Sequence, residues 1–281
     1  MMKQLICTFT FVIVSAWAQA QAPAFHVTQQ GEGFPVLLLP GFATPGSVWD
    51  ETVAHLPDGY AYYQVSYAGF NGLAPIDTPW YETIKRELIA YVVDHDLREL
   101  RLIGHSLGGN LATEIAADLP DRVAQLVIVD ALACMREVMM PGVSAEQLAY
   151  DSPPSQQMLQ ASDETMRQTA RMTAQSMTQA PDKVDSLEHW MMQADRKTYV
   201  YGYVDLLKQD LRPKLSQITA PTLILGAPFP NTEAVKSTLE QQYADLENKT
   251  IRVAPDSRHF IMFDQPEWFY EQINAAFTPY E

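Results

Sequence analysis

Short apolar runs alternate with amphipathic stretches along most of the chain. Residues 36–39 form a continuous apolar run typical of a buried strand, and residues 60–67 combine alternation with aromatic side chains. The same criteria predict strands over 25–28, 101–104, 123–129, 222–225 and 250–253, and helical periodicity predicts helices over 47–56, 80–94, 110–119, 232–243 and 266–277, with Ser47 capping the first. This order predicts an α/β fold, a mainly parallel sheet flanked by helices.

The alternation stops between residues 131 and 219. This interval contains the breakers Pro141-Gly142 and Pro153-Pro154, several polar helical stretches and nine of the 12 methionines. It predicts a helical cap, 131–219, inserted into a core made of 21–130 and 220–281.

The first 20 residues have the pattern of a secretory signal peptide. Lys3 precedes an apolar run over 5–17, and small residues at Ala18 and Ala20 favour cleavage after Ala20. The run is shorter than the roughly 20 residues that a membrane-spanning helix needs. The pattern predicts a periplasmic or secreted protein with no membrane anchor in its mature form.

The composition also limits the classes of partner that the protein could bind. The chain has 281 residues, 47% of them hydrophobic, and 34 acidic against 19 basic residues give a formal net charge of −15. Such a charge disfavours binding to nucleic acid and anionic membranes. Signal cleavage would remove Cys7 and leave Cys134 alone, so the mature chain has no intrachain disulfide. The sequence does not define an oligomeric state.

One pentapeptide places a nucleophile between two predicted elements. Gly104-His105-Ser106-Leu107-Gly108 has the form G-x-S-x-G and lies between the strand at 101–104 and the helix at 110–119. In a strand–turn–helix context the serine occupies a tight, strained turn, and the glycines remove side chains that would clash there. Ser106 is therefore the predicted nucleophile.

A serine hydroxyl needs a base to take its proton, and the base needs an acid to orient it. His259 follows the strand at 250–253 and precedes the last predicted helix, so it should lie at the carboxyl edge of the sheet, near Ser106. The other histidines of the mature chain fall on predicted helices, on the first strand, in the cap or, for His105, inside the motif with the ring pointing elsewhere. His259 is the predicted base.

Over about residues 25–277 the chain resembles a capped α/β-hydrolase. The resemblance rests on Leu39-Pro40-Gly41-Phe42 followed by Trp49, on Gly104 to Gly109, on Pro120-Asp121-Arg122-Val123, on Ala220-Pro221-Thr222-Leu223, and on His259 followed by Gln265-Pro266-Glu267. It implies Ser106 as nucleophile, His259 as general base, and an oxyanion hole made by the backbone N–H groups of Phe42 and Leu107. Pro40 stands where many members have histidine, which matters little if the donor is backbone.

The acid departs from the family's common pattern. Most members carry an aspartate in the loop after the strand at 222–225, but here that loop, 226–231, has no carboxylate. Asp130 ends the strand at 123–129, again at the carboxyl edge, and some relatives carry their acid at this strand end. Asp130 is the predicted acid. Asp256 is the main alternative, and Glu233, Asp264 and a structural role for Asp130 remain open.

The identity of the predicted nucleophile limits the reactions that the protein could catalyse. The turn at residues 104–108 is called the nucleophile elbow in this family. Dehalogenase and epoxide-hydrolase relatives have an aspartate at the position of Ser106 in this elbow, so Ser106 favours hydrolysis of a small to medium ester through an acyl-enzyme. The alternatives are a proline-iminopeptidase-like or carbon–carbon bond hydrolase, although Gly-His-Ser-Leu-Gly differs from the usual iminopeptidase elbow, and a non-catalytic binding protein of the same fold. No H-E-x-x-H or C-x-x-C pattern is present, so no metal or cofactor is expected.

The cap should supply substrate specificity, because ligands in such folds lie between the sheet edge and its cover. The residues that follow Asp130 most closely are the expected contacts with the small-molecule substrate. They are Met135, Met139 and Met140 for an apolar acyl group and Arg136 for a carboxylate.

Overall fold

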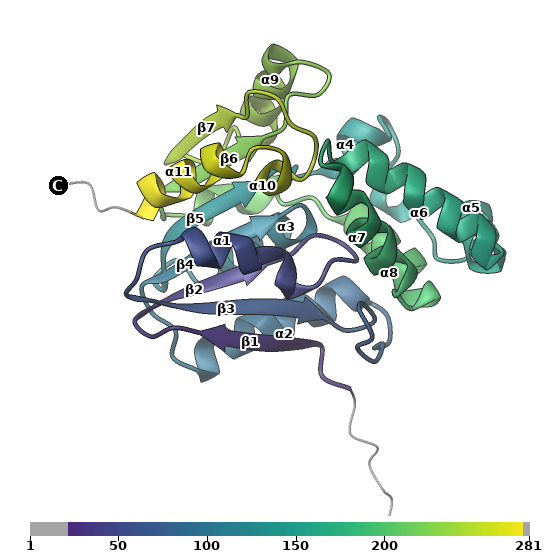
Figure 1. Cartoon of the computed structure of the whole chain (residues 1–281), viewed down its shortest axis with the longest axis horizontal. Coiled ribbons are helices and arrows are strands. Elements are labelled where there is room, and N and C mark those ends of the chain that lie inside the picture. Colours follow the sequence, from purple (N-terminus) through teal and green to yellow (C-terminus); the bar gives the residue numbers. More distant parts are fainter. Residues whose placement is uncertain (1–21, 278–281) are drawn as a thin grey trace, which may run out of the picture.

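The computed structural model describes residues 22–277 (Figure 1), so the predicted signal peptide and its cleavage site lie outside the described residues. A seven-stranded sheet forms the centre, in the order β1-β3-β2-β4-β5-β6-β7. The strands are β1 (Phe25–Gln30), β2 (Phe34–Leu39), β3 (Tyr60–Tyr67), β4 (Leu100–His105), β5 (Val123–Val129), β6 (Thr222–Gly226) and β7 (Lys249–Val253). Only β1 pairs antiparallel within it; the other pairs are parallel. The predicted α/β-hydrolase fold is confirmed.

Helices cover both faces of the sheet. The helices α1 (Asp50–His55) and α11 (Pro266–Phe277) lie in front of the strands in Figure 1, and α2 (Trp80–Asp94) and α3 (Leu107–Asp118) lie behind them. The helices α9 (Thr232–Gln242) and α10 (Ile261–Asp264) complete the C-terminal part. The predicted helix at 110–119 begins three residues early, directly after Ser106.

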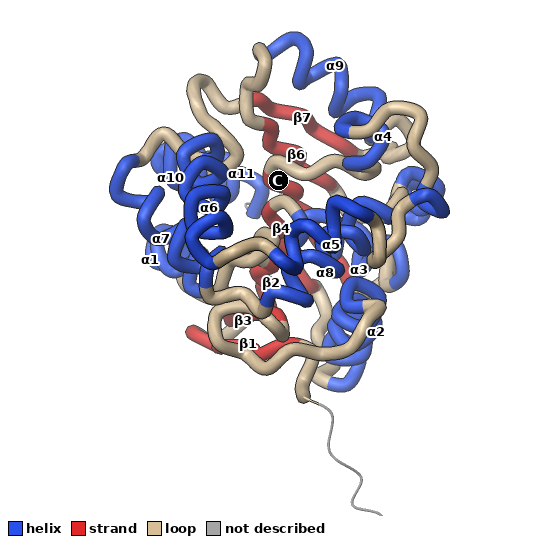
Figure 2. The backbone as a smooth tube through the Cα atoms, turned by 90° about the vertical axis from the view of Figure 1, so that its right-hand side faces the viewer, coloured by secondary structure: helices blue, strands red, loops and turns tan. Residues whose placement is uncertain are grey.

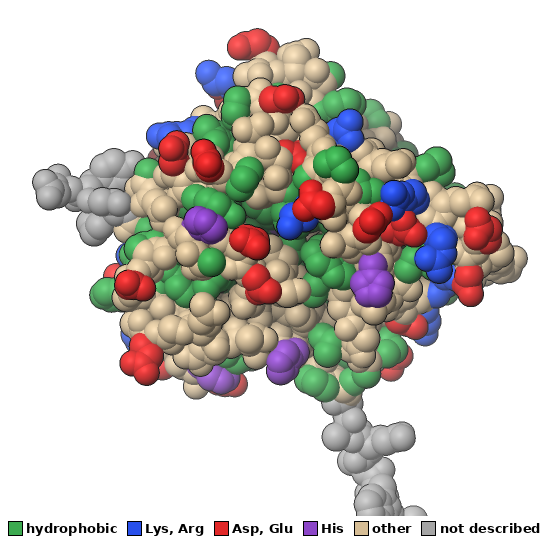
Figure 3. Space-filling model, in the orientation of Figure 1, with side chains coloured by type: hydrophobic (Ala, Val, Ile, Leu, Met, Phe, Trp, Pro, Cys, Tyr) green, Lys and Arg blue, Asp and Glu red, His purple; other side chains and the backbone are tan. Residues whose placement is uncertain are grey.

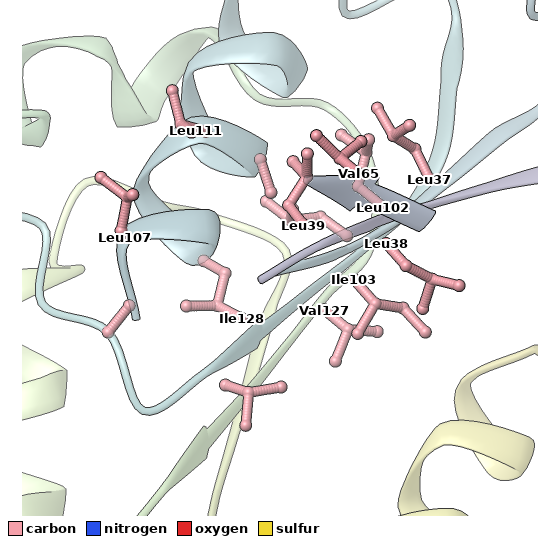
Figure 4. Close-up of a cluster of buried hydrophobic side chains, with 14 of the residues drawn as sticks. Leu37, Leu38, Leu39, Val65, Leu102, Ile103, Leu107, Leu111, Val127 and Ile128 are labelled. Carbon is pink, nitrogen blue, oxygen red and sulfur yellow. The ribbon is translucent and has the colours of Figure 1, made fainter. Parts of the chain in front are cut away.

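The central strands are buried on both sides, which explains their continuous apolar runs. The side chains of Leu37, Leu38 and Leu39 on β2 are completely buried, as are Leu102 and Ile103 on β4. Figure 4 shows part of this core, with residues of α3 beside the strands. The rigid centre of the sheet therefore carries the strand that leads to Ser106.

The prediction that Ser47 caps the first helix is wrong. The segment begins as a 3₁₀ helix, η1 (Gly46–Trp49), and Ser47 is an exposed residue inside it. The Gly46 N–H donates instead to the Ser66 hydroxyl on β3, at 2.8 Å. A side chain from a neighbouring strand thus takes the role of a local cap.

Helices gather over one end of the sheet where the cap was predicted, at the right in Figure 1 and in front of the strands in Figure 2. They are α4 (Met135–Met139), η2 (Ala145–Gln147), α5 (Pro153–Gln160), α6 (Asp163–Met177), α7 (Pro181–Met192), α8 (Arg196–Lys208) and η3 (Arg212–Gln217). The boundaries of the cap at 131 and 219 stay a prediction.

A buried carboxylate fixes α8 to the core. Asp205 accepts hydrogen bonds from the backbone N–H groups of Trp80 at 2.7 Å and Tyr81 at 3.3 Å, and from the Tyr150 hydroxyl. The two N–H groups are the first of α2 and have no partner within that helix, and the helix dipole favours a negative charge there. The Asp205 carboxylate of α8 thus accepts the two N–H groups at the start of the core helix α2.

Candidate active site

Ser106 lies at a strained turn between β4 and α3. Its backbone has φ 54° and ψ −121°, a region that few residues other than glycine adopt. The turn is held by the Ser106 N–H, which donates to the Val129 carbonyl at 2.9 Å, while the Ser106 carbonyl accepts the N–H of Gly109 at 2.8 Å. The strand–turn–helix context predicted for the motif is present.

The two glycines of the motif allow the backbone to approach itself closely. A methyl group added at Gly104 would lie 2.1 Å from the Gly108 carbonyl oxygen, and one at Gly108 would lie 2.0 Å from the Leu39 carbonyl oxygen. Both obstacles are backbone atoms that cannot rotate away. The elbow therefore requires glycine at 104 and 108 for steric reasons.

The structure brings His259 and Asp130 together. The His259 Nδ1 lies 2.7 Å from one carboxylate oxygen of Asp130, and the other oxygen accepts the Ala227 N–H at 2.8 Å. Asp130 itself has a positive φ of 45°, and its N–H donates to the Leu225 carbonyl at 2.7 Å. The loop after β6, which lacks a carboxylate, thus supplies the N–H group that holds this one.

The alternative acids have other partners. Asp256 is exposed and accepts a hydrogen bond from the Gln179 side chain at 2.9 Å, and Glu233 is an exposed residue in the first turn of α9. Asp264 accepts hydrogen bonds from Thr178 and the Arg258 N–H. Among these carboxylates, Asp130 alone is hydrogen-bonded to His259 in the described residues.

Ser106 and His259 emerge at the same edge of the sheet. Because Asp130 binds Nδ1, the other imidazole nitrogen, Nε2, is left for proton transfer. No hydrogen bond joins it to the Ser106 hydroxyl within residues 22–277. Such bonds are often long before substrate binds and shorten in the complex.

The two predicted oxyanion donors are available. Within the described residues no hydrogen bond occupies the N–H of Phe42 or of Leu107. Position 41 brings the Phe42 loop against the elbow, since a methyl group added at Gly41 would lie 3.4 Å from the Ser106 Cβ. The N–H of Leu107 is the first of α3, where the helix dipole also favours a negative charge.

The Phe42 ring fixes the loop between core and cap. It packs in edge or tilted contacts against four rings of the core and of α8, with centroid distances of 4.9 to 6.2 Å. These rings belong to Phe70, Trp80, Tyr199 and Tyr203. Neither tyrosine was among the predicted site residues, because no local motif marks them.

His105 does not point away from the site as predicted. Its ring is completely buried, its Nε2 donates to the His259 carbonyl at 3.0 Å, and its centroid lies 4.5 Å from the His259 ring. Burial, followed by the nearby His259 charge, holds the pKa of His105 well below its usual 6.5. It therefore stays neutral and serves as a hydrogen-bond donor to the loop that carries His259.

The predicted substrate contacts lie on α4, beside α8. Met135 and Met140 are partly buried, and Met139 is exposed, with its sulfur 4.0 Å from the Tyr203 hydroxyl. The Arg136 guanidinium donates to the carbonyls of residues 207 and 208, at 2.8 and 3.0 Å, at the end of α8. A role in substrate binding stays a prediction for all four, and Arg136 already has these structural partners.

A cavity lies elsewhere in the cap. It has a volume of about 300 Å³ between α6, α7 and the start of α8. Its lining combines Met166, Met191, Met192 and Tyr199 with the charged residues Asp163, Arg167 and Arg196. The Tyr199 ring lies 5.3 Å from the Phe42 ring. The described part of the chain contains no cluster of side chains suited to hold a metal ion, and no helix there is long and apolar enough to cross a membrane.

Known proteins share both the sequence pattern and the fold. The sequence matches the alpha/beta hydrolase family over residues 36–272. It is 28% identical over 208 residues to the pimeloyl-[acyl-carrier protein] methyl ester esterase of Aeromonas hydrophila, covering 70% of this chain and 77% of that protein. For the esterase of the same name from Vibrio vulnificus, identity is 25% over 252 residues, covering 88% and 96%.

Solved structures agree in fold. An esterase from Exiguobacterium antarcticum superposes with a TM-score of 0.73 at 19% identity, covering 89% of this chain and 94% of that one. An enol-lactonase from Burkholderia xenovorans gives a TM-score of 0.75 at 18% identity, with 91% and 96% coverage. Together with the family match over most of the chain, these likenesses show that the protein is an enzyme of the alpha/beta hydrolase family.

Proposed function

We propose that this protein is a serine esterase that cleaves a small to medium ester through an acyl-enzyme, with Ser106 as nucleophile, His259 as general base and Asp130 as the orienting acid. The hydrogen bond of 2.7 Å between His259 and Asp130, at the edge where the strained Ser106 turn emerges, is the observation that carries the proposal. Relatives named as esterases support the same reaction class.

The proposed reaction has two steps, formation of the acyl-enzyme and its hydrolysis. His259 Nε2 takes the Ser106 proton as the hydroxyl oxygen attacks the ester carbonyl carbon, and the N–H groups of Phe42 and Leu107 bind the resulting oxyanion. The carbonyl re-forms, the carbon–oxygen bond breaks, and the alcohol leaves with the proton from His259. Water then repeats the attack on the acyl-enzyme, and the acid is released. Asp130 stabilises the imidazolium in both steps.

The cap cavity is the proposed site for the acyl group. Its volume of about 300 Å³ lies at the lower end of the range for ligand pockets, and three methionines line it together with the charged side chains of Asp163, Arg167 and Arg196. It adjoins Tyr199, which contacts the Phe42 ring of the proposed oxyanion loop. These sizes and positions favour a short to medium acyl chain.

The net charge and the predicted signal peptide support two further proposals, one on the charge of the substrate and one on the location of the enzyme. With a net charge of −15 and acidic side chains scattered over the face shown in Figure 3, the surface suits a neutral or apolar ester better than an anionic polymer. The predicted signal peptide at residues 1–20 indicates export, so the proposed location is periplasmic or extracellular. A cell-fractionation assay with a C-terminal tag tests this; retention of the uncleaved protein in the cytoplasm would refute it.

A substrate panel tests the function. It consists of p-nitrophenyl esters of increasing acyl length, monomethyl pimelate as a simple methyl ester related to the relatives' names, and aminoacyl-anilides. Turnover of the esters alone is expected. Preferential cleavage of the anilides would favour an iminopeptidase. A fluorophosphonate probe should label Ser106, and failure of the folded protein to react would favour a non-catalytic binding protein.

A further inference from the structure

The loop that carries His259 is hydrogen-bonded to the end of cap helix α6 on both sides of the histidine. The Phe260 N–H donates to the Met177 carbonyl at 3.0 Å, and the Arg258 guanidinium donates to the Thr178 carbonyl at the same distance. Carbonyls at the end of a helix have no partner within it, so the loop satisfies groups that α6 leaves open. The cap and the base are thus joined at this point.

One carboxylate strengthens this connection. An oxygen of Asp264 accepts hydrogen bonds from the Thr178 hydroxyl at 2.5 Å and the Gln179 N–H at 2.8 Å, and its second oxygen accepts the Arg258 N–H at 2.7 Å. Thr178 is almost completely buried, so its hydroxyl has no access to water as an alternative partner, whereas the two bonds from backbone N–H groups lie at the exposed side of Asp264. We name the paired segments 175–179 and 256–264 the α6–loop junction.

The opposite side of the same loop is held by the elbow. His105 donates to the His259 carbonyl, and Asp130 binds the imidazole. The backbone around His259 therefore lies between a rigid elbow and the junction. A shift of α6 would move the loop relative to Ser106, since the elbow is fixed by buried backbone contacts.

We propose that Thr178 and Asp264 are positioning residues that set the His259 imidazole through the α6–loop junction. The proposal rests on the proposed function, in which His259 removes the Ser106 proton. The cap then has two roles: it forms the substrate cavity, and it determines how well the base is placed. Loss of the junction should slow every ester alike, including an acetyl ester too small to fill the cavity.

A matched pair of variants tests the junction. Thr178→Val keeps the shape of the side chain and removes its hydroxyl, whereas Thr178→Ser keeps the hydroxyl. Arg171→Met is the control, because Arg171 forms ion pairs with Asp185 and Glu188 within the cap. Thr178→Val should lower kcat/KM about tenfold for both acetyl and longer esters, mainly through kcat, as expected for a small misplacement of a catalytic group. Thr178→Ser should keep kcat/KM near the wild-type value.

Two further readouts separate positioning from a general loss of stability. Hydrogen–deuterium exchange of the 257–261 backbone should rise in Thr178→Val and Asp264→Ala and stay unchanged in Arg171→Met. In a His259→Ala background, Thr178→Val should cause no further loss of rate, because the junction acts through the imidazole.

Three outcomes would overturn the proposal: unchanged loop exchange, a loss confined to long acyl chains, or an equal loss in the His259→Ala background. The proposed function fails separately, if the wild-type protein neither hydrolyses the panel nor reacts with a fluorophosphonate. In that case loop exchange alone decides whether the junction holds the His259 loop.

Discussion

Ser106 and His259 are placed by two different kinds of structure. Ser106 ends a central strand, and the steric limits of nearby backbone atoms at Gly104 and Gly108 determine its turn. His259 lies in a partly exposed loop, and hydrogen bonds from the cap, the elbow and β5 determine its position. The proposed nucleophile can thus be recognised from the local sequence, whereas the proposed base is positioned by partners that lie far away in the chain. Substitutions in the two regions should therefore fail in different ways.

The largest effect is expected at the nucleophile itself. Ser106→Ala removes the attacking oxygen and should reduce turnover about 10⁶-fold, as in other serine triads. Initial rates with a p-nitrophenyl ester, together with loss of fluorophosphonate labelling, measure this. Substantial remaining turnover in a folded variant would mean that another group carries the reaction.

The next effect distinguishes the acids. Asp130→Asn keeps the shape but removes the charge that orients His259, and should reduce turnover about 10⁴-fold. Asp256→Asn is the matched comparison and should lose at most about tenfold in turnover, the loss expected for a change in the α6–loop junction, since Asp256 contacts Gln179 and not His259. Comparable kcat values for the two variants would contradict the assignment of Asp130.

Substitution of an elbow glycine should act mainly by lowering the stability of the fold. Gly108→Ala places a methyl group against the Leu39 carbonyl, and should lower the free energy of unfolding by more than about 4 kcal/mol. Gly142→Asn is the control, because a Cβ added at Gly142 meets no atom within 4 Å beyond its two neighbours in the chain, and asparagine tolerates the positive φ there. Urea unfolding of both variants tests this. A stable Gly108→Ala variant would show that the elbow is less tightly packed than described.

The smallest effect concerns pH. The pKa of His105 is held well below 6.5 in the folded protein, whereas the unfolded chain has the ordinary value. Below about pH 6.5 the unfolded state therefore binds a proton that the folded state does not, and stability should fall as pH falls, by up to about 1.4 kcal/mol per unit. His105→Gln, which retains a donor, should remove this slope. Urea unfolding between about pH 5 and 8 measures it; identical slopes would contradict it.

The same contrast explains what the sequence could predict. The positions of the strands along the chain and the proposal of Ser106 follow from local patterns, because buried strands appear as apolar runs and the elbow as a serine between two glycines. Asp130 could be proposed because strand ends meet at one edge of a parallel sheet. These inferences needed no knowledge of distant contacts.

The remaining features depend on partners that no local pattern reveals. The role of His105 depends on the carbonyl of a residue 154 positions later, and Asp264 meets Thr178 across 86 positions. The error at Ser47 has the same cause, since Ser66 on another strand satisfies the Gly46 N–H. Tertiary hydrogen bonds replaced the local ones that the prediction assumed.

The position of Asp130 has a consequence for protein engineering. Because the proposed acid directly follows β5, the loop after β6 contributes only the Ala227 N–H to holding it, and Phe229 further along is 83% exposed. Residues 228–230 thus form a surface bend, close in sequence to Ala227, on which the proposed chemistry places no demand, whereas Asn231 after them caps α9. Diversified or lengthened sequences could be grafted there to reshape the approach to Ser106 while the proposed triad is left intact.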